Sequence, residues 1–120
     1  MKKFFAIFSF LVLTSGCAIN PQNPEQTVFQ MRGTQNVVLR AAVEYKELKP
    51  CATPKVQPCS DKVVVTQLQL ADKVTDTALS AAESAVRTPG FGKNIVDSAI
   101  SAANAALVAF QTIVATIERK

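Results

Sequence analysis

The chain has 120 residues and a formal net charge of +4 at pH 7, and it contains neither histidine nor tryptophan. The lack of histidine removes the commonest general base and a common metal ligand. Acidic and basic side chains alternate, as over residues 40–49, so a concentrated basic face for nucleic acid is excluded. We therefore expect one small domain without catalytic residues, a metal site or a cofactor.

The first residues have the features of an export signal. Lys2 and Lys3 precede the apolar stretch FFAIFSFLVL at residues 4–13. This length is typical of the hydrophobic part of a signal peptide and is too short for a membrane-spanning helix. We predict that residues 1–16 are a cleaved signal peptide.

The signal ends in LTSGC at residues 13–17, which resembles the lipobox of bacterial lipoproteins. Small residues precede the cysteine as in that family, whereas Thr14 stands where the family prefers leucine or valine. The resemblance implies that Cys17 receives a diacylglyceryl group, that cleavage precedes it, and that its new amino group is acylated. Several acyl chains anchor a protein stably in a membrane. In this family an aspartate directly after the cysteine often causes retention in the inner membrane. Because position 18 is alanine, the outer membrane is expected. Residues 17–23 are the predicted lipidated tether.

Two further cysteines, Cys51 and Cys59, form an even pair for the oxidising periplasm. Prolines at positions 50, 54 and 58 prevent regular structure around them. We predict a disulfide that closes this loop and stabilises the domain by about 2–3 kcal/mol in the chain-entropy treatment. A redox or metal-binding pair is the alternative, but the spacing is not CxxC and no imidazole completes a metal site.

Residues 24–120 form the predicted helical domain, and its first helix is expected at about residues 24–49. Asn23 is the predicted N-cap, Pro24 occupies the first helical position, and Gln26 is placed to complete a capping box. Gly33 and Thr34 weaken the early part, where a kink or a late start is the alternative to a continuous helix.

Two more helices are expected at about residues 60–87 and 94–118. Ser60 and Asn94 are the predicted N-caps. Apolar or small residues recur at helical spacing in all three segments. The predicted core positions are Met31, Val38, Ala41, Ala42, Tyr45 and Leu48, then Val64, Leu68, Ala71, Thr75, Ala78, Ala82 and Ala85, then Val96, Ala99, Ala103, Ala106, Phe110, Ile113 and Ile117.

These segments predict an all-α fold, an antiparallel three-helix bundle with the disulfide-closed loop between its first two helices. The alternatives are an elongated hairpin or an oligomer that completes the core, because the helices are rich in alanine. Carboxylates at positions 44 and 47, and again at 72 and 76, are expected to lie on solvated helix faces rather than in a catalytic pair.

Phe91 stands between two glycines in the predicted turn after the second helix. It could contact a partner or fold back to cap the bundle, and we favour the cap. The terminal Glu118-Arg119-Lys120 resembles the end of the murein lipoproteins, in which the last lysine is joined to peptidoglycan, so a link through Lys120 is implied. A basic helix end is also common for dipole reasons alone.

The motif PCSD at residues 58–61, before an alanine-rich helix, resembles small helical lipoproteins of Gram-negative bacteria and their prophages. We expect a membrane-anchored, non-enzymatic structural or protein-interaction module on the periplasmic side, with an envelope protein as partner. If the gene is prophage-borne, superinfection exclusion or lysis is the alternative. Binding of a small lipophilic ligand is a further alternative, although alanine-rich interfaces leave little room for a pocket.

Overall fold

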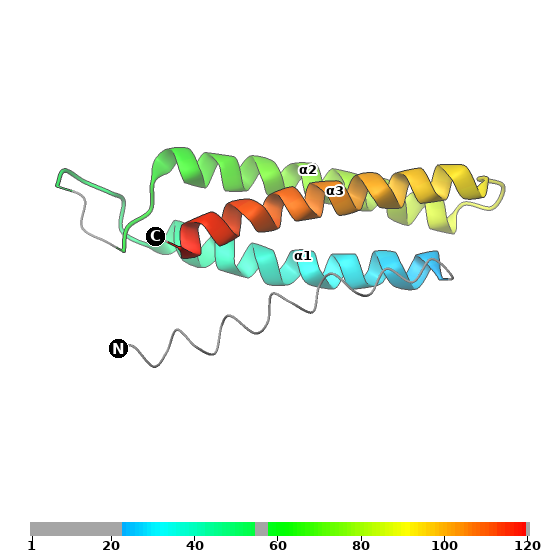
Figure 1. Cartoon of the computed structure of the whole chain (residues 1–120), viewed down its shortest axis with the longest axis horizontal. Coiled ribbons are helices and arrows are strands. Elements are labelled where there is room, and N and C mark those ends of the chain that lie inside the picture. The colour runs from blue at the N-terminus through cyan, green and yellow to red at the C-terminus, as the bar shows by residue number, and fades with distance from the viewer. Residues whose placement is uncertain (1–22, 55–57, 120) are drawn as a thin grey trace.

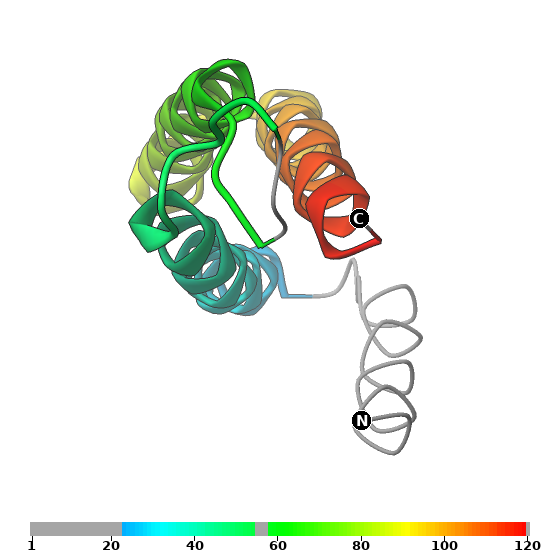
Figure 2. The same cartoon turned by 90° about the vertical axis from the view of Figure 1, so that its left-hand side faces the viewer.

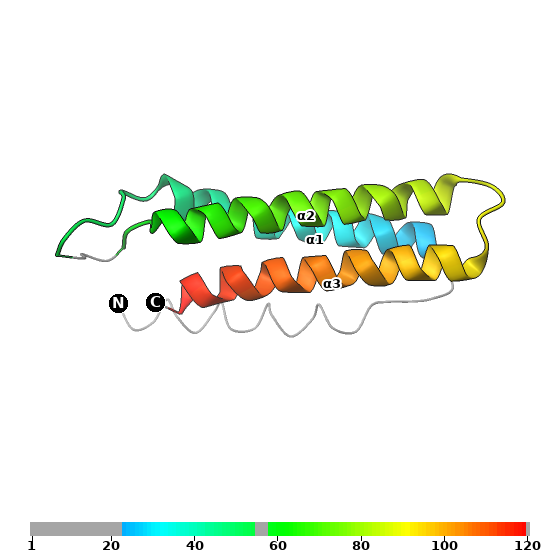
Figure 3. The ribbon, with the colours of Figure 1, turned by 90° about the horizontal axis from the view of Figure 1, so that it is seen from above.

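The structure, a computed structural model, describes residues 23–54 and 58–119 (Figure 1). Three helices account for most of this part of the chain: α1 (Pro24–Glu47), α2 (Lys62–Arg87) and α3 (Lys93–Glu118). They run antiparallel to their chain neighbours, as the view in Figure 3 shows. This is the predicted antiparallel three-helix bundle, and no strand accompanies it in the described ranges.

Each helix packs against both of the others, and α2 and α3 pack most extensively (Figure 2). The bundle has two distinct ends (Figure 1). The N-terminal end holds the start of α1 and the turn at residues 88–92, between α2 and α3. The disulfide end holds the loop between α1 and α2 together with the end of α3.

The N-cap and the first helical residue of α1 follow the prediction. Asn23 is the N-cap, its side-chain oxygen accepts a hydrogen bond from the backbone N–H of Gln26 at 3.2 Å, and Pro24 opens the helix. The alternative of a late start at Gly33 and Thr34 was wrong, because α1 runs without a break from Pro24 to Glu47. Long-range packing of the residues on either side of Gly33 outweighs its weak helix propensity.

The predicted caps of the other two helices were wrong by one or two residues. Asp61 caps α2 by accepting a hydrogen bond from the N–H of Val63, whereas the hydroxyl of Ser60 donates to the carbonyl oxygen of Leu48. Gly92, without a side-chain cap bond, precedes α3, so Asn94 already lies inside the helix. Ser60 is therefore used to close the loop, and the shorter turn starts α3 earlier.

The core consists of two clusters along the bundle. The cluster toward the N-terminal end contains Val28, Met31, Leu79, Ala82, Ala103 and Leu107. The cluster toward the disulfide end contains Val38, Ala42, Leu68, Phe110 and Val114. A buried polar residue, Thr75, donates its hydroxyl to the carbonyl oxygen of Ala71 in its own helix and lies 3.2 Å from that of Ala106 in α3.

The predicted core stripes had the right period but were not centred correctly. Leu79, which is fully buried, and Leu107 and Val114, which are nearly so, lay outside the predicted stripes. Several predicted members are only half-buried: Ala41, Tyr45, Leu48, Val64, Ala71, Ala78, Val96, Ala99, Ala106, Ile113 and Ile117. In a three-helix bundle the buried face points between two neighbours, and its centre depends on where both of them lie.

The loop between α1 and α2 confirms the predicted disulfide, which joins Cys51 to Cys59. The backbone closes the loop further, because the N–H of Cys51 donates to the carbonyl oxygen of Ser60 and the N–H of Ser60 donates to that of Lys49. The Tyr45 hydroxyl accepts a hydrogen bond from the backbone N–H of Asp61 at 2.9 Å. Its ring packs against the cluster at the disulfide end, as its spacing predicted.

Candidate functional site

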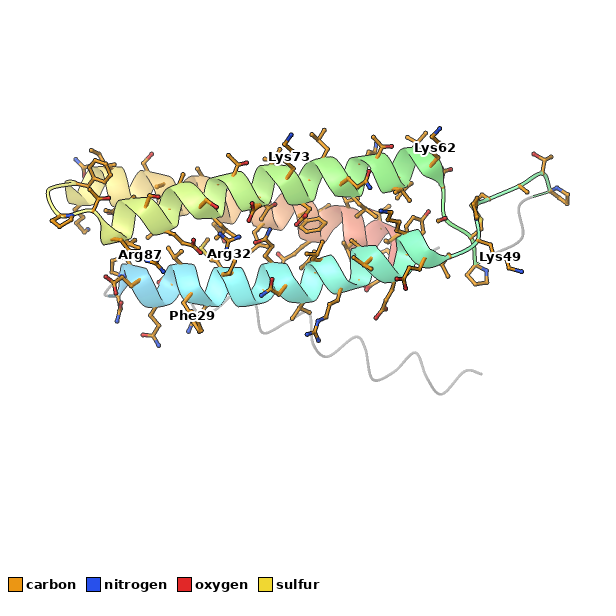
Figure 4. All side chains as sticks on the ribbon, turned by 180° about the vertical axis from the view of Figure 1, so that it is seen from behind. Phe29, Arg32, Lys49, Lys62, Lys73 and Arg87 are labelled. Carbon is orange, nitrogen blue, oxygen red and sulfur yellow. A yellow bond between two sulfur atoms is a disulfide. The ribbon has the colours of Figure 1, made fainter. Side chains whose placement is uncertain are left out.

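The most concentrated polar arrangement in the described structure surrounds Arg32, which projects from α1 toward α2 (Figure 4). Its Nε donates to Glu83 at 2.9 Å and its Nη1 to Asp76 at 2.6 Å, so one guanidinium pairs with two carboxylates of the neighbouring helix. Its Nη2 donates to the hydroxyl of Ser80 at 3.3 Å. We call these residues, with the two described next, the Arg32 network.

Gln35 extends the Arg32 network by one helical turn. It is 4% exposed, its side-chain oxygen accepts from Nη1 of Arg32 at 2.8 Å, and its amide donates to Asp72 at 3.1 Å. Both polar atoms of a nearly buried amide are therefore paired. Asp76, whose side chain is 62% exposed, and Glu44 and Glu47 are exposed as predicted, whereas Asp72 is half-buried. Both aspartates also bind side chains of α1, which the sequence did not predict.

The Arg32 network favours the ionised form of one carboxyl group, that of Glu83. The hydrogen bond from Arg32, reinforced by its positive charge, lowers the pKa of Glu83 below its ordinary value, although burial opposes the shift. The same hydrogen bond raises the pKa of Arg32. Both groups are therefore held in their charged forms, which is suited to joining two helices and unsuited to proton transfer near neutral pH.

An open depression of about 450 Å³ lies beside the Arg32 network at the N-terminal end. It lies between the start of α1 and the end of α2. Its lining residues are Asn23, Glu25, Gln26, Val28, Phe29, Arg32, Glu83, Val86 and Arg87. The four charged side chains in this lining make it a poor match for the small lipophilic ligand considered from the sequence.

The described residues that the sequence predicted to be functional lie at opposite ends of the bundle, with Phe91 at the N-terminal end and Cys51 and Cys59 at the disulfide end. Phe91 is 46% exposed and belongs to neither core cluster, so it does not serve as the buried cap that we favoured. The predicted lipidation site Cys17 and the predicted wall-linked Lys120 lie outside the described residues. Cys51 and Cys59 are joined to each other at the disulfide end.

The described residues contain no group of three or more His, Cys, Asp or Glu side chains that could hold a metal ion. Within the same ranges, every fully buried side-chain nitrogen or oxygen has a hydrogen-bond partner. An unpaired buried polar group aimed into a cavity would have indicated a catalytic or ligand site. The polar chemistry found here joins the helices to one another.

The surface carries a number of exposed, large apolar side chains. These are Phe29, Val37, Val43, Val63, Leu70, Val74, Phe91, Ile95 and Val108. In addition, α3 has no charged residue between Asp97 and Glu118. By length and composition α3 is the one helix among the described residues that could cross a membrane, but Ala103, Leu107, Phe110 and Val114 bury one of its faces in the bundle.

Sequence reasoning missed the Arg32 network. The available signal was Gln35, a polar residue that falls four positions after Met31 on the predicted core face. A polar residue at such a position requires a partner, but its partners lie on another helix.

Comparisons with known proteins add no relative, because no family model, no curated protein and no solved structure matches the chain.

Proposed function

We propose that this protein is a lipid-anchored, non-enzymatic module of the bacterial envelope, tethered through Cys17 to the periplasmic face of the outer membrane, where it binds another envelope protein. The observation that carries the proposal is the sequence LTSGC at residues 13–17 behind an apolar export signal. The disulfide between Cys51 and Cys59 supports an oxidising compartment.

The spacing between the proposed anchor and the folded domain supports a surface-bound module. Only residues 18–22 separate Cys17 from the helix cap Asn23. A tether this short holds the bundle close to the bilayer. The proposed module is therefore a rigid helical body at the membrane and not a domain on a long flexible linker.

The surface of the bundle supports binding of a protein. Leu70 and Val74, one turn apart on α2, are 62% and 52% exposed. Adjacent exposed apolar side chains are a feature of protein-contact surfaces, whereas single scattered ones are common on any protein. The Arg32 network and the disulfide keep this surface on a stable scaffold.

The anchor is tested by radiolabelled palmitate incorporation and by separation of inner and outer membranes from cells that express the protein. We expect label in the wild-type chain, recovery with the outer membrane, and loss of both on Cys17→Ser. A Cys51→Ser, Cys59→Ser variant is the control, since it removes the other thiols and should remain labelled. Soluble, unlabelled wild-type protein would refute the anchor.

Crosslinking in intact cells, followed by affinity capture and mass spectrometry, tests the proposed partner. We expect one envelope protein to be captured with the wild-type chain and to be lost with Cys17→Ser. Recovery of muropeptides attached through Lys120 would instead support the wall link that the terminal resemblance implies. Recovery of no specific partner would refute the interaction module. The prophage-borne roles stay predictions of the sequence resemblance.

A further inference from the structure

Three exposed apolar side chains belong to segments that lie at or near the N-terminal end of the bundle. Phe29 in the second turn of α1 is 79% exposed, Phe91 in the turn between α2 and α3 is 46% exposed, and Ile95 at the start of α3 is 53% exposed. They come from three separate segments that the antiparallel topology brings to one end (Figure 1). None of them belongs to the core clusters.

The same end is the one from which the tether leaves. Six peptide links join Cys17 to Asn23, so the cap residue lies at most about 20 Å from the anchored cysteine. Phe29 lies only about 7.5 Å along the helix from Pro24, at 1.5 Å per residue. The disulfide end is about 35 Å from Pro24, which is the length of α1.

We propose that the N-terminal end of the bundle docks on the bilayer that holds the acyl chains of Cys17, with Phe29, Phe91 and Ile95 entering the interfacial region. The inference rests on the lipid anchor of the proposed function. Three side chains would bind a membrane weakly by themselves, but the anchor keeps them at the surface and makes their docking intramolecular. Aromatic and aliphatic side chains are suited to this boundary.

Charge contributes little to the proposed docking. Arg87 and Lys93 lie at this end, but Glu25 and Asp97 also lie there, and Lys93 is paired with Asp97 at 3.5 Å. Arg32 is neutralised by the acidic residues of its network. Apolar insertion should therefore persist at high ionic strength, whereas attraction to anionic lipids would be screened.

Docking at this end would set the orientation of the bundle. The loop closed by Cys51 and Cys59 would then lie at the end farthest from the bilayer, and the exposed Leu70 and Val74 of α2 would be held clear of the bilayer on the side of the bundle. A partner in the periplasm would then meet a defined surface.

Single tryptophans test the proposal, because the natural chain has none. Phe29→Trp and Phe91→Trp report on the N-terminal end. Val63→Trp is the matched control, since Val63 is 66% exposed in the first turn of α2 at the disulfide end. The mature chain, starting at Cys17, is coupled through that thiol to a maleimide phospholipid in vesicles of phosphatidylethanolamine and phosphatidylglycerol.

We expect the emission of the Phe29→Trp and Phe91→Trp chains to shift to shorter wavelength on coupling and to be quenched by phospholipids brominated on their acyl chains. The Val63→Trp chain should show neither change, and added salt should alter none of the three results. No shift and no quenching at positions 29 and 91 would overturn the docking. Equal quenching at all three positions would overturn the orientation, because the bundle would then lie flat.

The chain is attached to the phospholipid by a maleimide reaction in vitro, so this experiment does not depend on lipidation in cells. Absence of palmitate label would refute the proposed anchor. The quenching in vesicles would still show whether the N-terminal end of the bundle docks on a bilayer. Labelled protein with unquenched tryptophans would refute the docking and leave the anchor intact. All three substitutions are at exposed positions, and an unchanged far-ultraviolet circular dichroism spectrum establishes that the chains are folded.

Discussion

Replacing Arg32 with methionine is expected to lower the free energy of unfolding by about 2 kcal/mol. Each of its two ion pairs is partly exposed and contributes at most about 1 kcal/mol. Loss of the guanidinium also leaves the side-chain oxygen of the nearly buried Gln35 without its donor, which costs about 1 kcal/mol. For a domain of this size, whose total stability is about 5–15 kcal/mol, this is a large fraction.

A double-mutant cycle of Arg32→Met, Glu83→Gln and the double variant measures how much of this loss of stability comes from the interaction between Arg32 and Glu83. We expect a coupling energy of about 0.5–1 kcal/mol from urea unfolding followed by circular dichroism, with the disulfide intact and an unchanged m-value. Lys93 and Asp97 form the control pair. They are 3.5 Å apart and mostly exposed, so their coupling should be about 0.3–0.5 kcal/mol or less.

The coupling energy between Arg32 and Glu83 should also decrease as the pH is lowered. Because Arg32 lowers the pKa of Glu83 in the folded state, the stabilisation is fully present above the ordinary carboxyl value of 4.5. It should be lost as the pH falls through the lowered pKa of the folded state. A coupling no larger than that of Lys93 with Asp97, or one that persists after Glu83 is protonated, would refute the role given to the Arg32 network.

Three further tests of the scaffold use the same unfolding assay. Cys51→Ser with Cys59→Ser should lower the free energy of unfolding by about 2–3 kcal/mol, and a loss below about 1 kcal/mol would show that the loop is held by its other contacts. Leu79→Ala should cost about 2–5 kcal/mol, because the side chain is fully buried. Leu70→Ala, at a position that is 62% exposed, should cost little. Equal costs for the two variants would contradict the assigned core. Tyr45→Phe should cost about 0.5–1.5 kcal/mol by removing the acceptor of a loop N–H, and an unchanged stability would show that this hydrogen bond contributes nothing net.

The sequence by itself determined the local features of this protein. Asn23 and Pro24 start α1 because a side-chain acceptor and a fixed φ act within one turn. The proline-rich segment between Cys51 and Cys59 predicted a disulfide-closed loop, and helical periodicity predicted three helices. Each of these depends on residues close together in the chain.

Tertiary structure decided the features that depend on neighbouring helices. Ser60 is used to close the loop, which leaves Asp61 to cap α2. Leu79 became central to the core because α1 and α3 both lie against its face of α2.

The Arg32 network and the placement of three exposed apolar side chains at the N-terminal end also depend on the tertiary structure. Arg32 meets Glu83 across 51 positions of sequence, and Phe29 shares the N-terminal end with Phe91 and Ile95 only because the helices are antiparallel. Periodicity shows which face of a helix is apolar, but it carries no information on which residue of another helix lies opposite. The lengths of the helices and the packing between them set that register.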